Sequence, residues 1–362
     1  MSAEMNPPSH FCCQDSRAQQ RQLSTPLLAG FLGCCLIASA GPAVDRDWLR
    51  NPAVVQVDTS SDIFAIGDAH SDYARLAAAM NAAGLIAGVP KQPNDVKWSG
   101  GRAVLVVTGD MIDKGPRAID VLRVLRSLQV SALTNGGRVI VLAGNHEAEF
   151  LADPAAPKGE SFANQLKAKG IRPSDVASCK SDIGEFLCSL PFAARVNDWF
   201  FSHAGNSSGR TLAQLAADLQ RGVMKDGFAT KQLIGNGSVL ESRLNIKDGQ
   251  PWIDARLADQ TEKQLLSANA AALGVRHIVE GHVPSQVKFA DGAVREPGEM
   301  FQIFGMLFLI DTGMSEGVDN SRGAVLHITS KNATAICPDG KRTLLCDAGN
   351  QRGLGRAAPC GK

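Results

Sequence analysis

The sequence lacks an excess of charge of either sign. Its 362 residues include 37 Lys and Arg against 36 Asp and Glu, which leaves a formal net charge of +1 at pH 7. Proteins that bind nucleic acid or an anionic membrane surface through charge normally carry a clear basic excess. We therefore expect no nucleic acid partner and no charge-driven binding to membranes.

Closely spaced metal-binding cysteines and internal repeats are missing as well. None of the nine Cys lies in a CxxC or Cys/His pattern, which argues against a structural zinc site. No segment recurs at a fixed period, so the chain has no signature of a repeat architecture. Hydrophobic residues make up 44% of the chain, which is enough to bury a core.

The chain is also short of long hydrophobic runs. The apolar run at residues 26–37 is shorter than the about 20 residues that a membrane-spanning helix needs. Arg17 and Arg21 precede it, and the sequence ASA at 38–40 follows it. This order predicts a signal peptide over residues 1–40, cleaved near Ala40. An uncleaved anchor and lipoprotein acylation at Cys34 are the alternatives. All three imply export to the periplasm or the outside. If the signal peptide is cleaved, we expect no stable membrane span to remain.

Cysteine usage agrees with export. Four of the nine Cys lie in the predicted leader, and the other five are Cys179, Cys188, Cys337, Cys346 and Cys360. The first two are nine residues apart, and so are the next two. In an oxidising compartment this spacing predicts the disulfides Cys179–Cys188 and Cys337–Cys346, with Cys360 free. Five separate thiols are the alternative.

The most informative feature is a construction that recurs along the chain. An apolar run typical of a buried strand ends directly in a turn that carries Asp, Asn or His. The five such ends are 63–66 followed by GDAH, 104–108 by GDMIDKG, 139–142 by AGNHE, 199–202 by HAG, and 277–280 by GH. Chemistry in α/β sheets gathers beyond the carboxyl ends of strands. We therefore expect one shared site, rather than five unrelated strand ends.

The side chains at these ends suit metal ions. Their hard oxygen and borderline nitrogen donors favour Mn, Fe or Zn, and no thiolate demands a softer ion. The candidate ligands are Asp68, His70, Asp110, Asn145, His203 and His282.

The order of the motifs resembles a known family. GDxH, then GDxxD(R/K)G, then GNHE, then two later His residues are similar to the calcineurin-like metallophosphoesterases, and most of all to the PPP-type phosphatases of the bacterial Shewanella-like branch. Supporting segments are WSGG at 98–101, GGRV at 136–139, GHVP at 281–284 and IDTGMS at 310–315. The resemblance spans residues 62–330. It implies an α/β fold in which a two-sheet β-sandwich is flanked by helices (αββα), with two divalent metal ions at one edge.

The resemblance also implies how the ligands are shared. One ion would be held by Asp68, His70 and Asp110, and the other by Asp110, Asn145, His203 and His282. A hydroxide that bridges two ions about 3.5–4 Å apart would then attack phosphorus in line.

His146 follows the ligand Asn145 and is free to donate a proton to the leaving group, with Asp113 placed to orient it. A loop His without a role is the alternative for His146, and a residue favoured by a helix dipole is the alternative for Asp113.

Two cations are candidates for binding the phosphate. PPP-type enzymes usually have Arg where this chain has Lys114, and Lys binds phosphate without the two-pronged contact of a guanidinium. Arg243 resembles a second phosphate-binding Arg of the family, with an ordinary exposed Arg as the alternative.

We therefore predict a phosphomonoester hydrolase that acts on a phosphorylated protein or small molecule. Hydrolysis of dinucleotide polyphosphates or of phosphodiesters is the alternative among enzymes. A metal-binding protein without catalysis is the alternative from another class, although the intact pair of Asp113 and His146 argues against it. The expected organisation is a signal peptide at 1–40, a linker at 41–61, a catalytic domain at 62–330 and a Cys-bearing tail at 331–362. We expect this tail to be an appendage or a frayed end.

Alternating strands and helices are typical of βαβ units. Helices are expected at 73–86, 116–130, 147–152, 162–169, 183–189, 210–224 and 262–273. Later strands at 286–289, 306–311 and 324–328 are expected to be antiparallel and to form half of a second sheet.

Overall fold

The structure is a computed structural model that describes residues 46–243, 261–285, 294–349, 352–355 and 357–361. The predicted leader and the expected strand at 286–289 lie outside the described residues. Within the described part of the chain, no helix combines the length and apolar character needed to cross a membrane.

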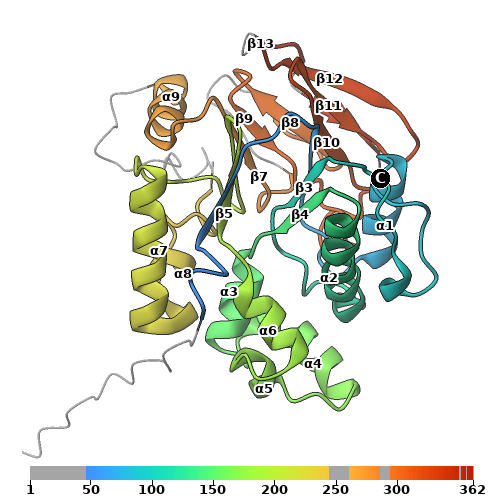
Figure 1. The fold of residues 1–362 in the computed structure, drawn as a ribbon, viewed down its shortest axis with the longest axis vertical. Helices are drawn as coiled ribbons and strands as arrows, with labels where there is room; N and C mark the ends of the chain where they lie inside the picture. Colours follow the sequence, from blue (N-terminus) through green and yellow to red (C-terminus); the bar gives the residue numbers. More distant parts are fainter. Residues whose placement is uncertain (1–45, 244–260, 286–293, 350–351, 356, 362) are drawn as a thin grey trace, which may run out of the picture. The chain divides into compact units, whose positions relative to one another are not determined.

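The strands and helices alternate through most of the chain (Figure 1). The strands are β1 (Val54–Val57), β2 (Ile63–Ile66), β3 (Val104–Val107), β4 (Arg138–Val141), β5 (Ala193–Val196), β6 (Trp199–Ser202), β7 (His277–Glu280), β8 (Glu299–Ile303), β9 (Leu307–Leu309), β10 (Val325–Ile328), β11 (Asn332–Ile336), β12 (Arg342–Asp347), β13 (Arg352–Gly353) and β14 (Ala357–Pro359). The helices are α1 (Tyr73–Ala82), α2 (Ala118–Thr134), α3 (Asn145–Ala152), α4 (Glu160–Ala168), α5 (Pro173–Ala177), α6 (Asp182–Ser189), α7 (Leu212–Asp226), α8 (Lys231–Ile234) and α9 (Glu262–Leu273), with 3-10 turns η1 (Pro93–Asp95), η2 (Pro157–Gly159) and η3 (Gly227–Ala229). A helix lies at each of the expected places.

In the described part of the chain, two seven-stranded sheets form the centre of the fold. The first sheet has the order β13-β12-β11-β10-β2-β3-β4, and the second has the order β1-β5-β6-β7-β9-β8-β14. In the first sheet, β2, β3 and β4 are parallel, with α1 and α2 in the crossovers between them. Figure 1 shows α1 and α2 on one side of the paired sheets and α7 and α9 on the other. The expected α/β fold with a two-sheet sandwich between helices is therefore confirmed.

The strands β2 and β3, which precede the motifs GDAH and GDMIDKG, are apolar throughout because both of their faces are buried. Ile63 and Ala65 of β2 belong to the core between the sheets, which also contains Phe201 of β6. Phe64 and Ile66, which alternate with them, belong to the core that includes the helices. Successive side chains of a strand point to opposite faces, so a strand between a sheet and a helix layer needs an unbroken apolar run.

The last part of the chain is arranged differently from our expectation. The expected antiparallel strand at 324–328 appears as β10, but it pairs with β2 in the first sheet. The strand β9 is antiparallel to β8 but parallel to β7. The expected appendage contributes β11, β12 and β13 to the first sheet and β14 to the second. The residues after 331 therefore extend both layers of the sandwich.

One predicted disulfide is confirmed and the other is wrong. Cys179 and Cys188 are bonded, with Cα atoms 5.9 Å apart. Cys337, by contrast, is bonded to Cys360, and Cys346 is a free, buried thiol. The register of the hairpin explains the error, because Cys346 pairs with Ala333, at the opposite end of β11 from Cys337. Four residues of strand span roughly 13 Å, well beyond the reach of about 7 Å for a disulfide. The actual bond joins a hairpin of the first sheet to the end of β14 in the second.

Candidate metal centre and active site

The candidate ligands meet at one edge of the sandwich because five strands deliver them. Asp68 and His70 follow β2, Asp110 follows β3, and Asn145 begins α3 just after β4. The second sheet supplies His203 after β6 and His282 after β7, two strands that are parallel neighbours. All six side chains are buried, with no more than 5% of any residue exposed. The structure therefore brings together all six ligands predicted from the sequence.

Glycine is required where the strand ends approach one another most closely. A Cβ atom on Gly144 would lie 2.2 Å from Oδ1 of Asp110, and one on Gly109 would lie 2.4 Å from the backbone nitrogen of Gly144. Gly109 also has a φ of 104°, which side chains rarely tolerate. Gly109 and Gly144 thus allow the turns after β3 and β4 to pack against each other around Asp110.

Asp110 is the centre of the cluster. Its Oδ2 lies 3.4 Å from Nε2 of His70, and its Oδ1 lies 3.3 Å from Nε2 of His203. Two groups of side chains have their ligand atoms close enough to hold an ion, namely His70 with Asp110 and His146, and Asp110 with His203 and His282. Since Asp110 belongs to both groups, its carboxylate is in the position of a ligand shared by two ions.

The histidine rings are held so that one nitrogen of each is available as a ligand. Nδ1 of His70 lies 3.2 Å from the carbonyl oxygen of Ile112, and Nδ1 of His203 lies 2.9 Å from that of Thr108. A carbonyl only accepts, so Nδ1 of each ring carries a proton, and Nε2 is the nitrogen that faces Asp110. Burial lowers the pKa of His70 to about 3, which keeps the ring neutral.

Unpaired buried atoms and repulsion between carboxylates also fit cation binding. Oδ1 of Asp68 and Nε2 of His282 have no hydrogen-bond partner among the described residues, although buried polar atoms are almost always paired. Oδ2 of Asp68 accepts the backbone N–H of His282 at 2.9 Å. Burial, then the charges of Asp311 and Asp110, raise the pKa of Asp68 well above its usual range. These residues fit divalent ions with oxygen and imidazole ligands.

His146 lies beside this cluster and contacts Asp113. Its Nδ1 is 3.2 Å from Oδ2 of Asp113 and 3.1 Å from the carbonyl oxygen of Lys158, while its Nε2 is 3.9 Å from Oδ2 of Asp110. Burial alone lowers the pKa of His146, but the carboxylates of Asp110 and Asp113 outweigh it and raise that pKa above its usual value. The geometry brings the predicted pair of His146 and Asp113 together, and it also allows His146 to act as a ligand with His70 and Asp110.

The two predicted phosphate-binding cations are both exposed at the site. Lys114 follows Asp113 directly, and its positive charge is one of the influences on the pKa values of Asp68 and His146. Burial, followed by the charges of His203 and Arg243, lowers the pKa of His282 well below its usual value. Arg243 is therefore close enough to influence the candidate metal site.

Several candidate residues adopt the left-handed backbone conformation. The φ angles are 40° for His70, 47° for Asp110, 67° for Asp113, 56° for Lys114 and 65° for His282. For a residue other than glycine this conformation costs about 1–2 kcal/mol. Such unfavourable backbone conformations cluster at functional sites, where the surrounding packing maintains them.

Glu147 is an important residue whose role the sequence analysis missed. Its carboxylate accepts four backbone N–H groups, from Asp110, Met111, Ile112 and Gly144, at distances of 2.7–3.1 Å. Glu147 thereby attaches the turn that contains Asp110 to the start of α3. A signal was present, because a Glu three residues after a helix N-cap is the mark of a capping box. Lys158 and Glu241 also join the site through His146 and Asn145, and no motif points to them.

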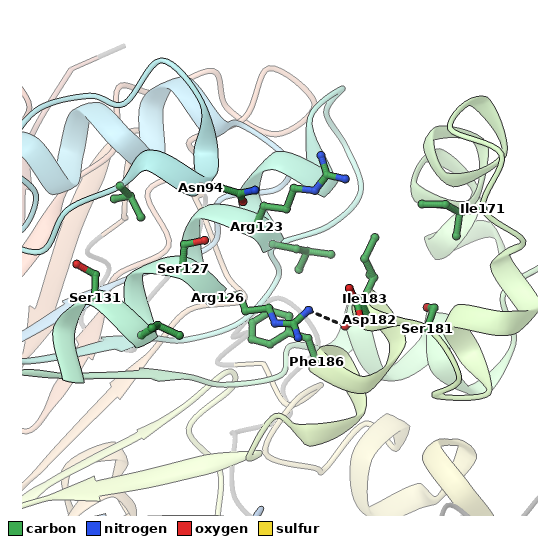
Figure 2. A pocket seen from close by; sticks show the side chains of 13 residues that line it. Asn94, Arg123, Arg126, Ser127, Ser131, Ile171, Ser181, Asp182, Ile183 and Phe186 are labelled. Atoms are coloured by element: carbon green, nitrogen blue, oxygen red, sulfur yellow. Dashed lines mark hydrogen bonds between the residues drawn. The ribbon is translucent and has the colours of Figure 1, made fainter. Parts of the chain in front are cut away.

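A separate groove lies between α2 and α6. It has a volume of about 900 Å³ and is lined by residues that include Arg123, Ile183 and Phe186. Figure 2 shows Arg126 on its wall, donating a hydrogen bond to the carbonyl oxygen of Asp182. No candidate ligand or catalytic residue lines this groove.

Comparison with known proteins identifies the family. The profile of the calcineurin-like phosphoesterases matches residues 61–296. An uncharacterised protein of Schizosaccharomyces pombe is 27% identical over 76% of this chain and 79% of its own length. The Shewanella-like protein phosphatase 1 of Plasmodium berghei is 28% identical over 70% of this chain and 67% of its own length.

A solved structure has the same fold. The cold-active protein-tyrosine phosphatase of a psychrophilic Shewanella species superposes with a TM-score of 0.59 at 21% identity, covering 83% of this chain and 84% of that one. The resemblance inferred from the motifs is thus confirmed. The chain is a metal-dependent phosphoesterase that belongs to the calcineurin-like phosphoesterase family.

Proposed function

We propose that this protein hydrolyses phosphomonoesters with the help of two divalent metal ions. The observation that carries the proposal is the position of Asp110, whose two carboxylate oxygens face different groups of ligand atoms. A carboxylate shared in this way is what a two-ion site requires. The contact between His146 and Asp113 beside it supports catalysis rather than metal storage.

We assign the ligands as the motifs indicate. One ion is held by Asp68, His70 and Asp110, and the other by Asp110, Asn145, His203 and His282. When bound, two such ions supply charge neutralisation for the phosphoryl oxygens and a nucleophile from water near neutral pH. The ligand chemistry favours Mn, Fe or Zn.

His146 is assigned as the proton donor to the leaving group. Asp113 and the carbonyl oxygen of Lys158 both accept from Nδ1, which leaves Nε2 as the atom that faces Asp110 and the metal site. The negative charge of Asp113 favours the protonated ring, which is the form that an acid catalyst needs. Lys114 and Arg243, which are exposed, are assigned to the phosphate of the substrate.

The substrate class we favour is a phosphorylated protein side chain. The support is the name of the P. berghei relative, a protein phosphatase, which aligns over more than two thirds of both chains. Phosphodiesters and dinucleotide polyphosphates are the competing substrates to exclude.

A panel of substrates tests the function. The purified protein, residues 41–362, is assayed with Mn²⁺, Fe²⁺ or Zn²⁺ on p-nitrophenyl phosphate, bis-p-nitrophenyl phosphate, diadenosine tetraphosphate, and peptides with phosphoserine or phosphotyrosine. We expect metal-dependent release of phosphate from the monoester and the peptides, and at most weak cleavage of the diester and the dinucleotide. The variant Asn145→Ala should lose metal and activity together. Preference for the diester or the dinucleotide would refute the proposal.

We further propose that the protein works in the periplasm or outside the cell, after cleavage of residues 1–40. Two disulfides are typical of an oxidising compartment. N-terminal sequencing of the exported protein should begin near Gly41, and a fatty-acylated N-terminal Cys34 would indicate a lipoprotein instead. A full-length protein confined to the cytoplasm would contradict export.

A further inference from the structure

A cluster of three charged residues lies against the metal site, outside the ligand motifs. Lys158, in the turn η2, donates to the carboxylates of Glu149 in α3 and Glu241 in the segment after α8. Its Nζ is 2.9 Å from Oε1 of Glu241. The Glu241 side chain is 11% exposed, while that of Lys158 is 41% exposed. The side chain of Glu149, the other carboxylate that shares this ammonium, is 20% exposed, so Glu241 is the better buried of the two.

Glu241 also makes a direct contact with a candidate ligand. Its Oε1 accepts a hydrogen bond from Nδ2 of Asn145 at 2.8 Å. A carboxylate can only accept, so it selects the NH₂ end of the amide. The other end of the amide, Oδ1, lies 3.0 Å from Nε2 of His203. An amide binds a metal ion through its oxygen and not through its nitrogen. The hydrogen bond to Glu241 therefore places Oδ1 of Asn145, the atom that can bind an ion, among the candidate ligands.

Lys158 connects Glu241 to the proton donor. Its ammonium binds Glu241, and its backbone carbonyl oxygen accepts from Nδ1 of His146 at 3.1 Å. The second oxygen of Glu241, Oε2, is 4.0 Å from Nε2 of His282, another candidate ligand. A single carboxylate therefore lies beside two of the ligands assigned to one ion, and a nearby lysine holds it in place.

We propose that Glu241 is a positioning residue that orients the amide of Asn145 and so raises the affinity for the ion bound by Asn145, with Lys158 holding Glu241. The inference rests on the proposed function insofar as Asn145 is a ligand. Partners that orient a ligand in this way typically change metal affinity by about 10–100-fold.

Metal titration of three variants tests the proposal. In Glu241→Ala, Mn²⁺ affinity measured by calorimetry on metal-free protein should fall about 10–100-fold for one of the two ions and stay unchanged for the other. Glu241→Gln keeps an oxygen that can accept from Asn145, so it should recover most of that affinity. The matched control is Glu149→Gln, because Glu149 binds Lys158 but makes no hydrogen bond to Asn145 in the described part of the chain. This variant should bind both ions like the wild type.

Activity gives a second readout. Because Glu241 acts through metal binding, saturating Mn²⁺ should restore the kcat of Glu241→Ala close to that of the wild type. If the Ala variant does not fold, Glu241→Asp, which withdraws the carboxylate by one methylene, must show the same selective loss.

Unchanged affinity for both ions, or a loss of kcat that saturating Mn²⁺ does not restore, would overturn the inference. If the wild type itself bound fewer than two ions or released no phosphate, the proposed function would fail instead.

Discussion

Replacing His146 by alanine should slow the hydrolysis of alkyl phosphates strongly and leave both metal ions bound. The imidazole is 6% exposed and is held at Nδ1 by Asp113 and by the carbonyl oxygen of Lys158. Only Nε2 is free to give a proton at the site. Proton donation by a positioned side chain contributes about 10²–10⁴-fold to a rate, which corresponds to about 3–5 kcal/mol of the activation barrier.

The loss should depend on the leaving group. The alkoxide that leaves phosphoserine is strongly basic and needs a proton, so we expect its hydrolysis to slow by about 10³-fold. The p-nitrophenolate anion is stable without one, so hydrolysis of p-nitrophenyl phosphate should slow by no more than about 10-fold. The assay compares kcat for both substrates and counts bound metal by elemental analysis. The matched variant Asp113→Asn keeps an acceptor for Nδ1–H and should show the same pattern with smaller losses.

Two results would refute this reasoning. Equal losses on both substrates would mean that His146 positions the substrate or its water. Loss of metal from the His146→Ala variant would mean that His146 is itself a ligand, which its grouping with His70 and Asp110 permits.

Three further predictions concern stability and the cysteines. Glu147→Gln replaces one of the two oxygens that accept backbone N–H groups with an NH₂ group that cannot accept. Because about two buried donors lose their acceptor, the free energy of unfolding should fall by about 2–6 kcal/mol. Urea unfolding that matches the wild type would contradict this prediction. Burial raises the pKa of the Cys346 thiol to about 11, so the folded protein, residues 41–362, should not react with a thiol reagent at pH 8. After denaturation without reductant, one thiol per chain should react. A count of three or more would contradict the disulfides. Cys360→Ser opens a loop with a sequence separation of 23 and should cost about 3 kcal/mol of stability.

The fold and the meeting of the candidate ligands at one edge could be predicted because their signals are local. Each strand end combines an apolar run with a glycine and a polar residue within a few positions, as at Asp68 and Asp110. Parallel strands bring their carboxyl ends to one edge, so the meeting of the ligands followed from the order of elements.

The features that were missed depend on contacts between distant segments. Asn145 and Glu241 are 96 positions apart, and no spacing rule connects them. The pairing of Cys337 with Cys360 depends on the register of β11 against β12 and on the position of β14 in the other sheet. Equal spacing of cysteines carries no information about either.

The left-handed backbone at the site has a consequence for engineering. Glycine would adopt the φ angles of His70, Asp110, Asp113, Lys114 and His282 without penalty. At about 1–2 kcal/mol each, such replacements would add up to an amount comparable with the about 5–15 kcal/mol that stabilises a typical protein. Backbone strain alone therefore favours changes that would remove candidate ligands and phosphate-binding cations from the site. Thermostable variants that keep their activity should be sought in the core and on the surface, with these five positions held constant.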